Sequence, residues 1–234
     1  LRHAGRFLLR LLPALLIAYA LMALIWPWSV VSPFNPLEAL FYFAHFFEKP
    51  WQELFDGTIL AVTDMPRRYV PTLFFRHIPE MFFVLGLAGA LGALIAAGNA
   101  AVGLGRRAAL VFLAVSALFP ILYAVLTRPA GYNGIRHFVF VLPPFAVLGG
   151  LAGVWLIARL MRRSRIIAAA AAALVVAGLI PPTIAIARLH PYEYTYYNWL
   201  AGGVKGADGR YMLDYWGLAT KEAALGLRAK VAAA

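Results

Sequence analysis

Cysteine is absent from this chain of 234 residues, and charged residues are scarce. Without cysteine the chain forms no disulfide and carries no thiolate, so thiol-based catalysis is excluded. Only 13% of the residues are charged, whereas 63% are hydrophobic. Soluble domains contain about 25% charged and about 45–50% apolar residues. The composition therefore indicates a membrane protein.

The motifs of many soluble enzymes are also missing. The chain has no phosphate-binding P-loop, no dinucleotide-binding glycine pattern, no Asp-x-Asp pair and no two histidines at metal-ligand spacing. Serine and histidine are too sparse to argue for a hydrolase triad. We therefore identify no cofactor and no metal ligands, although a divalent metal without a motif stays open.

Nucleic acid is not an expected partner, despite a net charge of +11. The basic residues lie in short clusters between apolar runs, which is the pattern of membrane topology. Five apolar runs are long enough to cross about 30 Å of hydrocarbon. We expect an all-α membrane protein with five transmembrane helices, at residues 11–28, 80–98, 108–127, 137–158 and 166–187.

Loop charge orients these spans. Arginines precede the first span and fill the turns around residues 106–107 and 159–165, and short basic loops face the cytoplasm. All ten acidic residues lie outside these basic clusters. We expect a bacterial inner-membrane protein with a cytoplasmic N-terminus. The bundle would occupy residues 1–187 with an outer loop at 29–79, and a small extracytoplasmic tail would follow at 188–234.

The outer loop begins with a predicted amphipathic helix at residues 36–49. Glu38, Tyr42, His45 and Lys49 recur at spacings of three or four, and apolar residues lie between them. Such a helix lies flat at the membrane surface in contact with lipids. Pro50 limits its length.

The tail opens with "LHPYEYTYYNWLAGG", residues 189–203, which mixes aromatic rings with hydrogen-bonding groups. An interfacial aromatic belt explains the rings. A carbohydrate or headgroup site explains both the rings and the polar groups between them. Candidate contacts to a sugar or acceptor are Tyr69, His190, Tyr192, Tyr194, Asn198, Trp199, Tyr215 and Trp216.

Three stretches resemble a known family: "YVPTLFFRHIPEMFFVLGLAGAL", "RHFVFVLPPFAVLGGLAGVWL" and "LHPYEYTYYNWLAGGVKGADGRYMLDYWGLATKEA". They are similar to the C-terminal half of multi-span glycosyltransferases related to protein O-mannosyltransferases and lipid A aminoarabinose transferases. The resemblance covers most of residues 60–225. It implies transfer of a sugar from a polyprenyl-phosphate carrier on the outer side, with inversion.

The family's catalytic base is an aspartate near the start of its full chain, and no position here matches that motif. Because this chain begins with Leu1, we expect it to be a fragment of a longer protein. The catalytic base would then lie in the N-terminal part of that protein, which this sequence does not include. Asp214, in "LDYWG", is the acid most closely surrounded by rings. Its preferred interpretation is that it holds the tail in place or touches an acceptor, ahead of a catalytic role.

Cations on the outer side suit this chemistry, because displacing a sugar from a lipid phosphate builds negative charge on the leaving group. The alternative is that they only anchor the chain at lipid phosphates. Arg136 and one of Arg67 or Arg68 are our preferred pair among the candidate phosphate-binding residues Arg67, Arg68, Arg76, Arg136 and His137.

Two other function classes stay open. A non-catalytic assembly subunit needs only the spans and outer segments. A transporter needs polar groups at mid-membrane, and the centres of the predicted spans contain almost none. The transporter is therefore the least favoured of the three.

Overall fold

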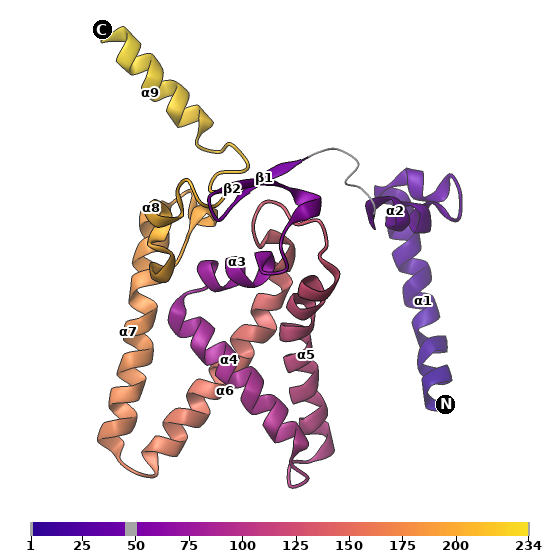
Figure 1. Ribbon diagram of the computed structural model, residues 1–234. Coiled ribbons are helices and arrows are strands. Elements are labelled where there is room, and N and C mark those ends of the chain that lie inside the picture. The colour runs from indigo at the N-terminus through magenta and orange to yellow at the C-terminus, as the bar shows by residue number, and fades with distance from the viewer. Residues whose placement is uncertain (1, 45–50, 234) are drawn as a thin grey trace. The chain divides into compact units, whose positions relative to one another are not determined.

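The computed structural model describes residues 2–44 and 51–233 and is 74% helical (Figure 1). It divides into two compact units, Leu1–Lys49 and Pro50–Ala234. Each unit is described by itself. From the sequence we also expect the tail to fold back over the residue 36–49 helix; this contact would join the two units, and it stays a prediction.

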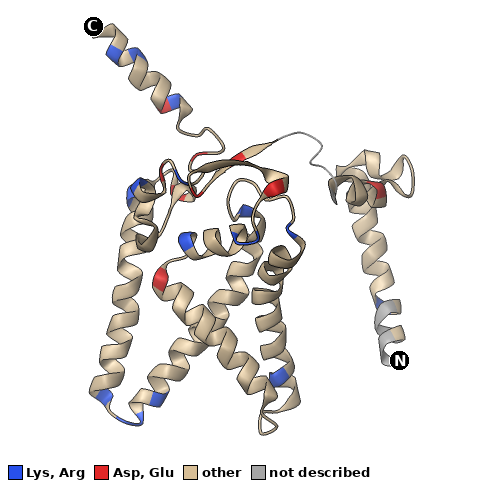
Figure 2. Cartoon of the chain, in the orientation of Figure 1, with Lys and Arg blue, Asp and Glu red and all other residues tan. Residues whose placement is uncertain are grey.

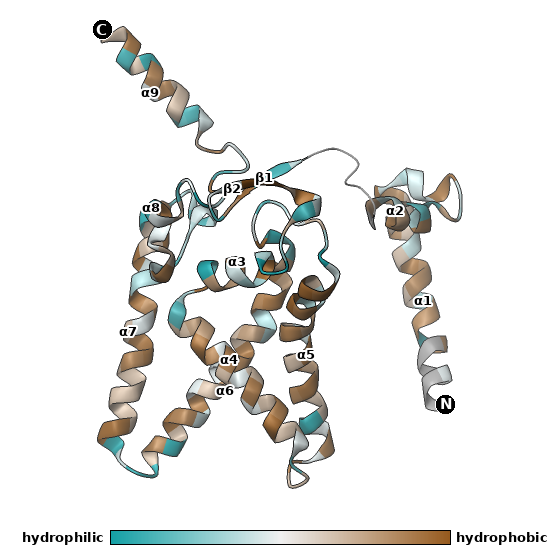
Figure 3. Cartoon of the chain, in the orientation of Figure 1, coloured by the Kyte–Doolittle hydropathy of each residue, from teal (hydrophilic) through white to brown (hydrophobic). Residues whose placement is uncertain are grey.

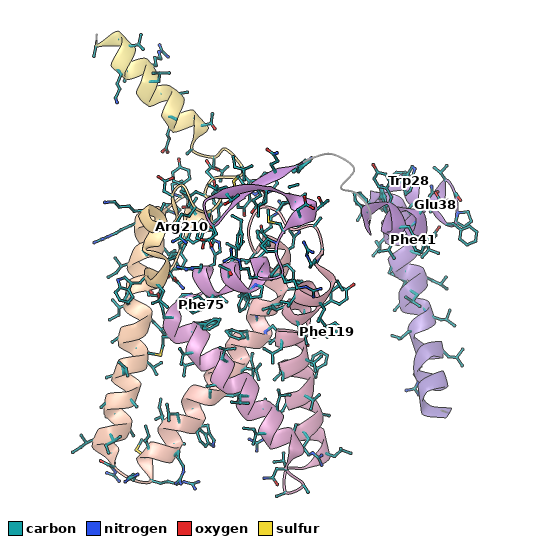
Figure 4. All side chains as sticks on the ribbon, in the orientation of Figure 1. Trp28, Glu38, Phe41, Phe75, Phe119 and Arg210 are labelled. Atoms are coloured by element: carbon teal, nitrogen blue, oxygen red, sulfur yellow. The ribbon has the colours of Figure 1, made fainter. Side chains whose placement is uncertain are left out.

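The first unit contains helix α1 (Arg2–Ile25), a 3-10 turn η1 (Pro27–Val30) and helix α2 (Asn35–Ala44). The Asn35 side chain donates a hydrogen bond to the Trp28 carbonyl at 2.6 Å, which closes the turn between the helices. Side chains labelled in Figure 4 include Glu38 and Phe41 of α2. The second part of the predicted amphipathic helix, with His45 and Lys49, lies outside the described residues.

The second unit contains four helices that are long and apolar enough to span a membrane. They are α4 (Glu80–Gly98), α5 (Leu104–Thr127), α6 (Leu142–Met161) with the 3-10 segment η3 (Arg136–Val141) before it, and α7 (Arg165–Leu189). Apolar residues run along all four (Figure 3). They coincide with four of the predicted runs. The first predicted run, residues 11–28, overlaps a shorter apolar helix, Leu9–Ile25. The chain is therefore an integral membrane protein whose long apolar segments are all α-helices.

Helices α4 and α6 cross at close range, because glycines lie at the crossing (Figure 1). A Cβ placed on Gly86 would lie 2.1 Å from the Phe145 ring, and one on Gly89 would lie 2.0 Å from the Leu148 carbonyl oxygen. Phe145 and Leu148 are buried. Small residues at such crossings let helix backbones approach each other in a membrane.

Pro143 and Pro144 occupy the first turn of α6. Their missing N–H groups cost nothing there, because the first amides of a helix have no partner within the helix. The residues before them form the 3-10 segment η3 and not an α-helix. The candidate span that begins at Arg136 therefore changes from 3-10 helix to α-helix at the two prolines.

A β-hairpin lies at one end of this unit and was not predicted. Strand β1 (Gln52–Phe55) pairs antiparallel with β2 (Thr58–Ala61), with Phe55 opposite Thr58. The two-residue loop is Asp56–Gly57, and both residues have positive φ, +52° and +81°. Asp-Gly is a preferred pair for this tight turn.

Helix α3 (Tyr69–His77) and the tail lie at the same end, which we call the loop end (Figure 1). The tail contains 3-10 turns η4 (Glu193–Thr195) and η5 (Trp199–Ala201) and helices α8 (Gly203–Ala207) and α9 (Thr220–Ala232). It joins the hairpin through a bridge between Phe55 and Tyr211 and a hydrogen bond from the Gly57 amide to the Arg210 carbonyl at 3.0 Å. Buried rings at the loop end include Phe55, Tyr69, Phe74, Tyr197 and Tyr211.

Charge differs between the two ends of the four-helix unit (Figure 2). Basic residues lie at the start of α5 and around the turn between α6 and α7, and no acidic residue is drawn at this end in the part of the chain that the structure describes. The loop end carries both signs. Within this unit, the loop end is therefore where acidic and basic side chains occur together and could act on one ligand.

Candidate functional site

Arg136 is the point at which the separate segments of the loop end converge. Its guanidinium carbon lies 4.6 Å from the ring centre of Tyr132, 5.1 Å from that of Trp216 and 5.9 Å from that of Tyr215. Tyr132 belongs to the loop after α5, whereas the other two rings belong to the tail. A guanidinium within about 6 Å of a ring face is attracted by the ring's negative face. We call Arg136 and these three rings the arginine cage.

The Arg136 guanidinium has no carboxylate partner at ion-pair distance within residues 2–44 and 51–233. Its Nε donates a hydrogen bond to His137 Nε2 at 3.2 Å, and the His137 ring lies 4.8 Å from Tyr132. Arg136 is half-buried. The planar end of this side chain is thus available to an anion, and it can grip two oxygens of a phosphate at once.

Glu53, on strand β1, is the buried acid beside the arginine cage. Only 4% of the residue is exposed. Its carboxylate accepts hydrogen bonds from the Tyr69 hydroxyl at 2.6 Å, from the Gly134 amide at 3.3 Å and from the Asn133 amide. Burial raises the pKa of Glu53, against the lowering effects of these hydrogen bonds and of the nearby Arg136. The predicted site residues did not include it.

A sequence signal for Glu53 does exist. It lies three residues before the Asp56–Gly57 pair, which is a preferred two-residue hairpin turn. Recognising the hairpin would have placed Glu53 and Phe55 on one face of β1, because side chains two apart in a strand share a face. An acid on the buried face of a strand needs partners, so it marks a site.

Two predicted phosphate-binding arginines contact backbone carbonyls. Arg67 donates to the carbonyls of Val125 and Leu126 at 3.0 and 3.2 Å, where α5 ends. Arg76 donates to the Leu200 carbonyl at 3.0 Å, and its Nε is buried without a hydrogen-bond partner among the described residues. These bonds hold α5 and the tail in place, and neither arginine has a described contact to the arginine cage.

Arg68 forms an ion pair with Asp56 at 3.2 Å and is largely exposed. Asp56 also pairs with Arg210 and accepts a hydrogen bond from the Tyr211 hydroxyl. These contacts lower the pKa of Asp56, with the Arg210 bond as the largest cause. They connect the hairpin turn to the tail. Figure 4 shows Arg210 at the loop end.

His77 is packed between α3 and the tail. Its Nδ1 lies 2.8 Å from the Tyr196 carbonyl oxygen, and its ring lies 4.1 Å from the ring of Tyr197. A carbonyl only accepts, so Nδ1 carries the proton. Burial lowers the pKa of His77 to about 4. The neutral ring therefore serves as part of the core between these two segments.

Asp214 organises the loop that carries Tyr215 and Trp216. Its carboxylate accepts hydrogen bonds from the Tyr194 hydroxyl and from the amides of Trp216, Leu218 and Ala219. The Tyr194 bond is the largest cause that lowers the pKa of Asp214 to about 2. Tyr194 also packs edge-on against Tyr215 at 5.3 Å. Asp214 and Tyr194 thus hold two rings of the arginine cage.

Asn198 fastens the tail to α3. Its side-chain amide donates to the carbonyls of Phe75 and Ile78 at 2.6 and 2.8 Å, and only 1% of the residue is exposed. The neighbouring Trp199 is 80% exposed. The two residues were predicted together as sugar contacts, but the structure turns one inward and the other outward.

The remaining tail candidates lie at the start of the segment. His190 is exposed and pairs with Glu193 through Nδ1 at 2.5 Å. Tyr192 hydrogen-bonds with Glu222, and this bond is the main cause that raises its pKa. Neither residue has a described contact to the arginine cage.

Of the candidate residues, the structure brings together Arg136, His137, Tyr215 and Trp216, with Tyr69 one hydrogen bond behind them through Glu53. Within the described residues, no group of three or more His, Cys, Asp or Glu side chains could hold a metal ion. In comparisons with known proteins, no family model, no curated protein and no solved structure matches the chain.

Proposed function

We propose that this chain is the C-terminal portion of an integral membrane glycosyltransferase that takes a sugar from a polyprenyl-phosphate donor. The carrying observation is Arg136, which has no ion-pair partner among the described residues and lies against three ring faces at the end of an apolar helical bundle. A phosphate-linked sugar at a membrane boundary needs both features. The guanidinium grips the phosphate, and the rings offer faces to the sugar.

The chemistry asks for stabilisation of the leaving phosphate. As the bond between the anomeric carbon and the phosphate oxygen breaks, negative charge grows on that oxygen, and a fixed cation lowers the energy of this state. The half-buried setting of Arg136 strengthens the effect, because charges interact more strongly away from bulk water. His137, which accepts from Arg136 Nε, helps to fix the direction of the guanidinium.

We propose no acid of this chain as the general base that accepts the acceptor's proton. Glu53 is 4% exposed and its carboxylate already accepts three hydrogen bonds from within the protein, so we do not assign it as the base for an incoming hydroxyl. Asp214 has a pKa lowered to about 2, which makes it a weak base at neutral pH. Both acids support the site and do not take part in the proton transfer.

We also propose that the loop end faces the extracytoplasmic side of a bacterial inner membrane. The support is charge asymmetry: Arg106 and Arg107 lie in the first turn of α5, next to its connection with α4, and Arg162 and Arg163 lie in the turn between α6 and α7. Short basic turns stay in the cytoplasm. The arginine cage is at the opposite end of these helices.

Reporter fusions test this orientation. A reporter that is active only outside the cytoplasm should work when it is fused after Lys230 and fail when it is inserted at Arg163. A reporter that is active only inside should show the reverse pattern. If both reporters point the other way, the arginine cage is cytoplasmic and a periplasmic donor is excluded.

The function itself is tested with the full-length protein that contains this chain, in reconstituted vesicles. Polyprenyl-phosphate sugars carrying a labelled hexose or pentose are supplied, and we expect release of free polyprenyl phosphate with transfer of the label. If the protein is an assembly subunit, the amount of polyprenyl phosphate released should equal that from vesicles without protein, whichever donor is supplied. That result, with the protein correctly inserted, would overturn the transferase and favour the subunit.

A further inference from the structure

We infer that Glu53 is the positioning residue for Arg136, holding the turn that presents the guanidinium to its ligand. The identity of that ligand rests on the proposed function, whereas the positioning rests on the contacts of Glu53. The carboxylate receives the amides of Asn133 and Gly134, and Arg136 follows two residues after Gly134. Strand β1 and the arginine cage are thus joined by one buried acid.

The turn needs such an anchor because of its backbone. Asn133 and Gly134 are consecutive residues with positive φ, +55° and +71°. A left-handed conformation at a residue other than glycine is strained and persists where surrounding contacts hold it. Successive amides in a turn of this kind form a concave site for an anion. Here the chain's own carboxylate fills that site.

Tyr69 fixes the same turn from a second direction. Its hydroxyl donates to Glu53 at 2.6 Å, and its ring lies against Gly131 so closely that a Cβ there would be 2.6 Å from Tyr69 Cε1. Only 3% of Tyr69 is exposed. The turn is therefore held at Gly131 by packing and at residues 133–134 by hydrogen bonds.

The charge of Glu53 is part of the arrangement. Two of its partners are backbone amides, which only donate, and the ionised carboxylate offers acceptor oxygens to both of them and to the Tyr69 hydroxyl. The ionised form is the one that satisfies them, and Arg136 is the cation whose charge favours it. Glu53 thus orients the turn, and its negative charge offsets the positive charge of Arg136. The two side chains do not form an ion pair, so the guanidinium stays available to a ligand.

The test is a double-mutant cycle on the full chain in detergent micelles, with farnesyl phosphate as the probe and isothermal titration as the measurement. Glu53→Gln should weaken binding about tenfold, because a carboxamide presents N–H toward donors and loses the charge. Asp64→Asn is the matched control: it removes one negative charge from the same outer segment, and Asp64 is exposed. It should change binding less than about twofold.

A residue that acts through Arg136 has no effect once Arg136 is gone. In an Arg136→Ala background, Glu53→Gln should therefore leave the residual binding unchanged, whereas independent effects would multiply. Amide exchange over residues 129–137 gives a readout without ligand. It should quicken in Glu53→Gln and stay at the wild-type rate in Asp64→Asn.

Unchanged exchange over residues 129–137 in Glu53→Gln would overturn the inference, as would an undiminished effect in the Arg136→Ala background. If the wild-type chain does not bind farnesyl phosphate, the proposed phosphate contact fails, and the exchange measurement still decides the positioning. If Glu53→Gln does not fold, Tyr69→Phe replaces it. That variant keeps the ring on Gly131, removes one donor, and should shift binding and exchange in the same direction by less.

Discussion

Arg136→Lys should reduce sugar transfer by about a hundredfold per inserted molecule, the scale expected when a fixed charge-stabilising group is lost from an active site. Lysine keeps the charge but loses the planar fork that grips two phosphate oxygens. It also loses the flat face that lies 4.6 Å from the ring centre of Tyr132 and 5.1 Å from that of Trp216. The measurement is transfer of label from the polyprenyl-phosphate donor, normalised to protein inserted in the vesicles.

Arg68→Lys is the control for this substitution. Arg68 lies at the same end of the protein, is largely exposed and is already paired with Asp56. Exposed ion pairs contribute little, so transfer should stay within about twofold of the wild type. Equal losses in both variants would mean that the loop end needs positive charge in general. Normal transfer in Arg136→Lys would leave the arginine cage as a membrane anchor.

The helices could be predicted because their signals are local. Each of the four spans in the second unit is a continuous apolar run, and Pro143 and Pro144 mark where α6 begins. The hairpin was missed for a different reason. Its strands are only four residues each, so the Asp56–Gly57 turn was the one strong sequence signal for it. The apolar composition of the chain favoured transmembrane helices as the interpretation.

The site could be predicted only in part, because its geometry depends on contacts between distant segments. The sequence predicted Arg67, Arg68, Arg76 and Arg136 on one side of the membrane and favoured Arg136 with one of Arg67 or Arg68, but it could not show which of them bind other parts of the chain. Their difference lies in partners up to 124 positions away, as in the bond from Arg76 to the Leu200 carbonyl. Three of these arginines are occupied by such partners, which no local pattern reveals.

Aromatic residues show the same limit. The density of rings in the tail predicted a surface that binds a ligand, an acceptor or a headgroup, but the structure divides the rings. Tyr197 is buried against Tyr211, whereas Trp216 is 63% exposed beside Arg136. Hydrogen bonds of Asn198 to α3 and of Asp214 within the tail fix the tail backbone at two points, and this sets which rings are buried and which are exposed.

Gly89→Ala should separate α4 from α6 and destabilise the protein by about 3 kcal/mol, the upper part of the usual cost of overpacking. The added Cβ would lie 2.0 Å from the Leu148 carbonyl oxygen and 2.3 Å from its carbon. Both are backbone atoms, so no side-chain rotation relieves the clash and one helix must move. The measurement is thermal unfolding in detergent, where the midpoint should fall.

Gly92→Ala is the matched control, because it makes the same change on the same helix at a position where a Cβ meets nothing within 4 Å. Alanine favours the helix over glycine by about 1 kcal/mol, so this variant should unfold at or above the wild-type temperature.

The pair also tests how the bundle supports the site. Since η3 carries Arg136 and leads directly into α6, a shift of α6 should displace the guanidinium from its rings. Gly89→Ala should therefore lose transfer even in the fraction that stays folded, and Gly92→Ala should keep it. Equal midpoints for the two variants would show that the α4–α6 crossing is looser than these distances imply.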